Sequence, residues 1–213
     1  MNNIGIIGLG YVGLPLALEF AKKYPTVAFD LNKKRISDLK NKFDYTKEVS
    51  KKDFFAAKQI KFTSNIKDLK SSNIYIVAVP TPINGRKEPD LKPLFLASKN
   101  VGKLLSDQDI VIFESTVYPG ATEEFCVPIL EKYSNLKFIN QKNKKVIKTG
   151  FYCGYSPERI NPGDKKNRIT NITKVTSGST SDVALKIDKL YKSIITAGTY
   201  MAESIKIAEA SKI

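Results

Sequence analysis

The stretch IGIIGLGYVGLPLALEF, residues 4–20, decides the fold of this chain. Its glycines Gly8, Gly10 and Gly13 have the spacing G-x-G-x-x-G, between a short apolar strand and the start of a helical pattern. In this context the first glycine permits a tight turn, the second lets the backbone approach a pyrophosphate, and the third lets the helix pack against the strand. The N–H groups at the helix start would receive the phosphates. The stretch therefore predicts a dinucleotide-binding corner.

Four neighbouring residues complete this expected cofactor site. Tyr11 and Val12 lie inside the glycine turn. A second expected strand ends at Asp30, close to where a carboxylate hydrogen-bonds the adenosine ribose, and an acid there favours NAD over NADP because it would repel a 2′-phosphate. Arg35 follows closely and could meet a phosphate. The alternative interpretation is a glycine-rich turn that only packs a strand on a helix.

Short β-branched runs alternate with amphipathic helical patterns, which predicts βαβ units and a parallel sheet. We therefore expect an α/β fold of the Rossmann type, doubly wound, with a mainly parallel sheet and helices on both faces. The expected strands are 4–7, 26–30, 60–63, 74–79, 110–114, 151–155 and 173–177. The expected helices are 12–23, 33–42, 91–105, 121–133 and 181–195.

Hydroxyl-bearing residues follow two more of the expected strands. Pro80 and Thr81 come after a buried strand, and Ser115 and Thr116 follow the next one. In an open parallel sheet, ligands bind beyond the carboxyl ends of the strands, so these residues are candidates to line the cofactor site. Each hydroxyl taken alone could equally be an ordinary turn or a helix cap.

The composition limits the partners of the chain. Its 213 residues are 42% apolar, which is enough for one core. Thirty-five basic against 21 acidic side chains leave a formal charge of +14, which would favour phosphate-bearing partners. Only four of the basic residues are Arg and the Lys are scattered, so we expect a solvated basic surface and no nucleic-acid partner.

The chain has no histidine and two cysteines, Cys126 and Cys153. It therefore cannot form a Ser-His-Asp triad, a Cys-His dyad or a His-based zinc site from its own residues. The uncharged run at 4–18 is too short and too rich in glycine to span a bilayer. We expect no metal, no membrane partner and a cytoplasmic location, where unpaired cysteines stay reduced.

The motifs GLGYVGLPLA, VPTP, ESTVYPGATEE, GYSPERINPGDK and AGTYMAESIKIAEASK occur in this order along nearly the whole chain. Together they resemble the UDP-glucose/GDP-mannose dehydrogenase family, and among its branches the bacterial UDP-N-acetylhexosamine 6-dehydrogenases of capsule synthesis. The basic segment QKNKKVIK, residues 141–148, departs from this resemblance, because the corresponding connection is usually shorter.

The resemblance implies an NAD-dependent oxidation of a sugar C6 alcohol to a carboxylate in two steps, with a cysteine thiolate holding the carbon between them. It implies that NAD is held by Gly8, Gly10, Gly13, Asp30 and Arg35, with Thr81, Ser115 and Thr116 near its ribose and nicotinamide.

The resemblance also implies three catalytic residues. Glu158 matches the carboxylate of thioester hydrolysis, Thr116 would help to position the water, and Lys212 matches the lysine that stabilises the developing oxyanion. Read without the resemblance, Glu158 could simply pair with Arg159 or with a lysine, and Lys212 is a polar position on an amphipathic helix.

The nucleophilic cysteine of the family belongs to a G-G-H-C segment, and neither Cys126 nor Cys153 matches it. We expect both to be buried core thiols. We also expect an NAD-binding domain over 1–198, the start of a truncated central dimerisation helix over 199–213, and no UDP-binding C-terminal domain.

Such a chain would bind NAD without turning over sugar nucleotide. The intact enzyme would be a homodimer that acts on a UDP-N-acetylhexosamine. The alternative is a stand-alone, catalytically inactive NAD-binding or scaffold module.

Overall fold

Seven parallel strands form the central sheet of the computed structural model, which describes residues 2–83, 85, 89–159, 163–164 and 168–212. The strand order is β3-β2-β1-β4-β5-β7-β6, so the direction of winding reverses between β1 and β4. A separate two-stranded parallel sheet pairs β8 with β9. The strands are β1 (Ile4–Ile7), β2 (Thr26–Phe29), β3 (Ile60–Thr63), β4 (Ile74–Val77), β5 (Ile110–Phe113), β6 (Lys137–Phe138), β7 (Gly150–Tyr155), β8 (Lys174–Thr176) and β9 (Thr199–Met201).

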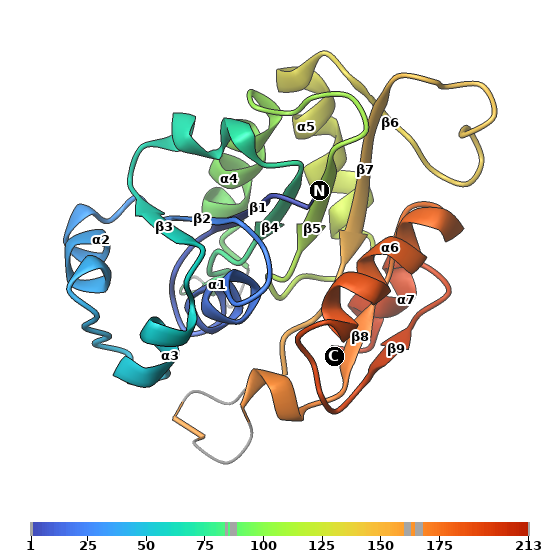
Figure 1. Cartoon of the computed structure of the whole chain (residues 1–213). Helices are drawn as coiled ribbons and strands as arrows, with labels where there is room; N and C mark the ends of the chain where they lie inside the picture. The colour runs from blue at the N-terminus through green and yellow to red at the C-terminus, as the bar shows by residue number, and fades with distance from the viewer. Residues whose placement is uncertain (1, 84, 86–88, 160–162, 165–167, 213) are drawn as a thin grey trace.

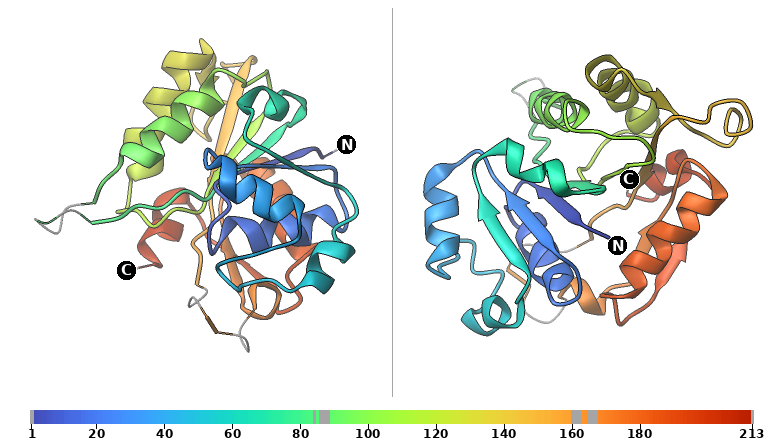
Figure 2. Two further views of the ribbon diagram at one scale, coloured as in Figure 1. Left: turned by 90° about the vertical axis from the view of Figure 1, so that its left-hand side faces the viewer. Right: turned by 45° about the horizontal axis from the view of Figure 1, so that its top comes forward.

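Helices cover both faces of the large sheet, as the doubly wound fold requires (Figures 1 and 2). Successive strand residues point to opposite faces, so Ile4 and Ile6 join one core cluster and Ile7 the other. The first cluster contains α1 and α6, and the second contains α4, α5 and α7. The α-helices are α1 (Gly13–Ala21), α2 (Lys33–Lys40), α3 (Lys51–Ala56), α4 (Lys92–Gly102), α5 (Val127–Ser134), α6 (Ser181–Lys192) and α7 (Ile205–Ala210). The expected α/β fold of the Rossmann type is confirmed.

The helix expected at 121–133 is divided in two. A π-helical turn, η2 (Thr122–Cys126), precedes α5. Pro128 lies in the first turn of α5 and has no N–H to donate back into η2, which favours a local change in the hydrogen-bond pattern. Short elements escaped prediction, because two to six residues show no clear period; α3, β6 and β9 are examples. The basic segment 141–148 is a largely exposed series of turns between β6 and β7.

A buried ion-pair network joins the small sheet to the large one. The Lys174 ammonium on β8 lies 2.6 Å from the Glu114 carboxylate after β5 and 3.0 Å from the Glu158 carboxylate after β7. The Tyr191 hydroxyl on α6 donates to the other Glu114 oxygen. All of these side chains are less than a tenth exposed. One cation therefore links β5, the segment after β7, β8 and, through Glu114, α6.

Burial and ion pairing shift the pKa values of Glu114 and Lys174 in opposite directions. Burial raises the pKa of Glu114, although the adjacent Lys174 ammonium opposes the shift. For Lys174, burial alone would lower the pKa, but the Glu114 and Glu158 carboxylates outweigh it and the pKa is raised. Lys174 therefore stays charged, and without it two carboxylates would be buried without their cation.

Replacing Lys174 should test this network. We expect Lys174→Met to lower the free energy of unfolding by about 3–5 kcal/mol, because removal of one partner leaves buried charge uncompensated. The loss should be smaller at pH 5 than at pH 8, since protonation of the raised-pKa Glu114 relieves it. Urea unfolding at both pH values measures the effect.

Lys192→Met is the matched control. Lys192 lies 2.8 Å from Asp188, but its side chain is 58% exposed, so its loss should cost less than about 1 kcal/mol. Equal losses in the two variants would contradict the assigned role of Lys174.

Candidate functional site

The glycine turn lies at the carboxyl end of β1, beside β4, where the strand order reverses. Gly8 has φ +93°, and an added Cβ there would lie 2.8 Å from the Ala78 carbonyl oxygen. A Cβ on Gly13 would lie 1.8 Å from the Gly8 carbonyl oxygen. A Cβ on Gly10 would meet nothing within 4 Å. The first and third glycines therefore meet packing constraints, whereas the second faces open space.

The start of α1 is suited to an anion. No side chain caps it at Val12, and its first turn contains no acidic residue. A phosphate at this helix start could therefore accept hydrogen bonds from backbone N–H groups. Tyr11 is 47% exposed at the same corner. Open space beside Gly10 and an uncapped helix start together fit the pyrophosphate of a dinucleotide.

Asp30 and Arg35 hold the glycine turn from the neighbouring strand and helix. The Leu9 N–H donates to Asp30 Oδ2 at 2.8 Å, and Arg35 Nε donates to the Leu9 carbonyl at 2.9 Å. Both backbone groups of Leu9 are thus bound between Gly8 and Gly10. The turn is therefore fixed before any ligand arrives.

Arg35, which the sequence suggested could meet a phosphate, is buried. Its side chain is 1% exposed, and Nη1 lies 2.8 Å from the Asp44 carboxylate. Burial alone would raise the pKa of Asp44, but hydrogen bonds from Thr46 and Arg35 lower it below its usual range. The Tyr45 ring lies 4.3 Å from the guanidinium carbon. Arg35 Nη2 is buried and has no partner among the described residues, so direct contact with a cofactor stays a prediction.

The loops after β4 and β5 are joined to each other. The Thr81 hydroxyl donates to the Thr116 carbonyl at 2.7 Å, and the Ser115 hydroxyl donates to the Val79 carbonyl at 2.7 Å. Pro80 and Thr116 are both exposed. The structure therefore brings these loops together at the edge of the sheet where the glycine turn lies. Contact of Pro80, Thr81, Ser115 and Thr116 with a cofactor stays a prediction.

Glu158 and Lys212 lie in contact. The Lys212 ammonium donates to the Glu158 main-chain carbonyl, and Arg159 Nη2 donates to the Ser211 carbonyl at 2.6 Å. Burial lowers the pKa of Lys212, although the Glu158 carboxylate opposes the shift. The Glu158 carboxylate also pairs with Lys174, which agrees with the alternative that Glu158 forms an ion pair with a lysine. Its catalytic role, like those of Thr116 and Lys212, stays a prediction.

Four buried polar residues next to this site escaped prediction: Glu114, Lys174, Tyr191 and Glu209. Lys174 carried the most visible signal, because it is a charged residue inside an expected strand. The strand is only three residues long, so alternation could not show that its lysine faces inward. Glu209 looked like any polar position of an amphipathic helix, although it is fully buried.

The cysteines are buried, as expected. Cys126 is 1% exposed and Cys153 is fully buried. Burial raises the pKa of Cys126 to about 12 and that of Cys153 well above its usual range. Thiols of this kind do not supply a thiolate near pH 7. Within the described residues, no group of three or more His, Cys, Asp or Glu side chains is placed to hold a metal, and none of the helices could cross a bilayer.

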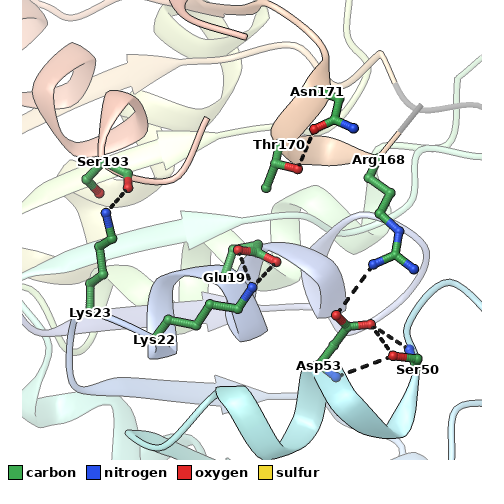
Figure 3. Close-up of polar contacts among 9 residues, drawn as sticks. All are labelled: Glu19, Lys22, Lys23, Ser50, Asp53, Arg168, Thr170, Asn171 and Ser193. Atoms are coloured by element: carbon green, nitrogen blue, oxygen red, sulfur yellow. Dashed lines mark hydrogen bonds and ion pairs between the residues drawn. The ribbon is translucent and has the colours of Figure 1, made fainter. Parts of the chain in front are cut away.

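A groove of about 690 Å³ lies between α1, α3 and the 3-10 turn η3 (Ile169–Asn171). Figure 3 shows two ion pairs along it, Lys22 with Glu19 and Arg168 with Asp53. Of the described residues that line it, none belongs to the predicted site. Its described lining residues include four basic and four acidic side chains, so among them neither sign is in excess.

Comparison with known proteins agrees with this geometry. Residues 2–195 match the sequence profile of the UDP-glucose/GDP-mannose dehydrogenase family, NAD binding domain. The chain is 58% identical over 210 residues to the UDP-N-acetyl-D-glucosamine 6-dehydrogenase of Salmonella typhi, covering 99% of this chain and 47% of that protein. It is 54% identical over 210 residues to the enzyme of the same name from Pseudomonas aeruginosa, covering 99% of this chain and 48% of that protein.

Solved structures show the same fold. A UDP-N-acetyl-D-mannosamine dehydrogenase from Pyrococcus horikoshii superposes with a TM-score of 0.84 at 28% identity, covering 99% of this chain and 49% of that one. The chain thus spans about half the length of the curated relatives it matches. With the profile matched over residues 2–195, the chain belongs to the UDP-glucose/GDP-mannose dehydrogenase family and contains its NAD-binding domain.

Proposed function

We propose that this chain binds NAD at the glycine turn and serves the oxidation of a UDP-N-acetylhexosamine at C6, from alcohol to carboxylate. The oxidation takes two steps, and NAD supplies the hydride acceptor in each. One observation carries the cofactor assignment: a rigid turn with open space only at its second glycine, beside an uncapped helix start.

The substrate class is supported by the relatives. Two UDP-N-acetyl-D-glucosamine 6-dehydrogenases share more than half of their aligned residues with this chain. Because the chain spans about half of their length, the activity and a homodimeric assembly belong to our proposal for the whole polypeptide. The NAD preference over NADP is supported by Asp30, whose carboxylate lies against the glycine turn.

The catalytic roles are those that the family resemblance implies, and the contacts beyond β5 and β7 support them. Lys212 would stabilise the developing oxyanion, and its ammonium lies at the Glu158 carbonyl in partly buried surroundings, where a fixed charge acts more strongly than in water. The Glu158 carboxylate would take the proton of the attacking water during thioester hydrolysis, and Thr116 would orient that water.

The 213-residue chain alone should bind NAD without turning over sugar nucleotide. Covalent catalysis needs a reactive thiolate, and both Cys126 and Cys153 are buried with raised pKa values.

Two alanine substitutions in the glycine turn should separate binding from folding. Gly10→Ala places its methyl group in open space, so stability should change by less than about 1 kcal/mol. The same methyl would occupy the path of the pyrophosphate, so NAD affinity should fall by about tenfold or more. Calorimetric titration and urea unfolding measure the two effects.

Gly13→Ala is the matched comparison. Its methyl would lie 1.8 Å from the Gly8 carbonyl, so it should lower the free energy of unfolding by more than about 2 kcal/mol. If Gly10→Ala binds NAD as the unmodified chain does, the pyrophosphate site has been wrongly assigned.

Substitutions of Asp30 should test the cofactor preference. Asp30→Ala removes a charged hydrogen-bond acceptor and should weaken NAD binding by about tenfold or more. Asp30→Asn keeps an acceptor for the Leu9 N–H but loses the charge, so it should narrow the preference for NAD over NADP. Titrations with both nucleotides measure the ratio.

The control for net charge is Asp182→Asn, at the exposed start of α6. It should leave both affinities unchanged. No binding of either nucleotide to the folded, unmodified chain would overturn the proposed function.

A further inference from the structure

Glu209 is a fully buried carboxylate on the short helix α7. Its Oε2 accepts from the Gly120 N–H at 2.5 Å, and its Oε1 accepts from the Thr122 N–H at 2.9 Å. Both donors are backbone groups, 89 and 87 residues earlier in the chain. Glu209 therefore attaches α7 to one defined point of the loop that follows β5.

That point is the start of the helical segment formed by η2 and α5. Leading N–H groups of a helix lack internal partners, and no side chain caps η2 at Ala121. Glu209 supplies this cap from another helix, with the negative charge that a helix start favours. Gly120 has φ +102°, and an added Cβ there would lie 2.5 Å from a Glu124 carboxylate oxygen. A side chain at position 120 would therefore be strained and would meet Glu124, next to the N–H group that binds Glu209.

The same loop carries Thr116. The Tyr155 hydroxyl donates to the Ser115 carbonyl at 3.1 Å, and the Thr81 hydroxyl donates to the Thr116 carbonyl at 2.7 Å. These two bonds hold the first part of the loop from β7 and from the loop after β4. Glu209 holds its end from α7.

Lys212 lies three residues beyond Glu209, in the turn that follows α7, where its N–H donates to the Glu209 main-chain carbonyl at 3.1 Å. A helix as short as α7 has little stability of its own, so its orientation depends on its contacts. Ile205 and Ala208 provide apolar contacts with the core, which are non-directional. The two hydrogen bonds of Glu209 are directional, and they set how α7 is rotated.

We propose that Glu209 is a positioning residue, which holds Lys212 at the Glu158 carbonyl and in fixed relation to the Thr116 loop. This inference rests on the proposed function, in which Lys212 and Thr116 act on the same substrate. The Glu209 carboxylate is fully buried, and both of its oxygens are bound to backbone N–H groups, so its proposed role acts through Lys212.

Competitive acetylation of lysines in the 213-residue chain, followed by mass spectrometry over a range of pH, tests this role. In the unmodified chain Lys212 should react as an amine with a lowered pKa, because it is partly buried. In Glu209→Gln, the profile of Lys212 should move to higher pH, because its ammonium would leave the partly buried position that lowers its pKa. Loss of a nearby negative charge alone would move the profile of Lys212 the other way.

Two further variants complete the experiment. Glu203→Gln removes the same charge from an exposed position just before α7 and should leave Lys212 unchanged. Glu209→Asp keeps the charge but is one methylene shorter, so it should reproduce the change in Lys212 at least in part. It also replaces Glu209→Gln if that variant does not fold, as judged by circular dichroism.

The outcomes separate this inference from the proposed function. An unchanged Lys212 profile in a folded Glu209 variant would overturn the positioning role, even if NAD still binds. If the folded, unmodified chain does not bind NAD, the proposed function is overturned instead. A shifted Lys212 profile with unchanged NAD affinity is the result we expect.

Discussion

The close contact between the Gly8 carbonyl and the backbone of Gly13 is the constraint on which this structure depends. It lets α1 begin shortly after β1, with its uncapped start at the edge of the sheet where the strand order reverses. A side chain at position 13 would force the helix away from the strand and remove that corner. Packing of the backbone and recognition of a phosphate are therefore two results of one geometric requirement.

The two predicted cofactor-binding side chains beside this corner, Asp30 and Arg35, both hold the scaffold. Arg35 is buried against Leu9 and Asp44, so its observed contacts stabilise the turn. Asp30 also holds the turn, although it is only half-buried. A residue that the sequence suggests for cofactor binding can thus act first through the backbone that it supports. Such support fixes a ligand-binding loop in advance and reduces the entropy lost on binding.

Beyond β5 and β7, buried charges add to the apolar contacts that join the elements. Lys174 brings Glu114 and Glu158 together, and Glu209 binds the amides at the start of η2. Such pairs stabilise little compared with apolar packing, but they are specific in direction and distance. The segments that carry the proposed catalytic residues Glu158 and Lys212 are therefore held in defined positions by directional contacts.

The sequence by itself determined the α/β architecture and the dinucleotide-binding corner, because glycine spacing and apolar periodicity act over about 20 residues and need no distant partner. It placed β1 and β3 at their observed bounds, and it extended β4 past Val77 only because Ala78 and Val79 continue the apolar run. Only the tertiary structure decided that Arg35 is buried, that Lys174 faces Glu114 and that Glu209 caps η2. The last two contacts join residues 60 and 89 positions apart, and no local pattern in the sequence predicts contacts between residues so far apart.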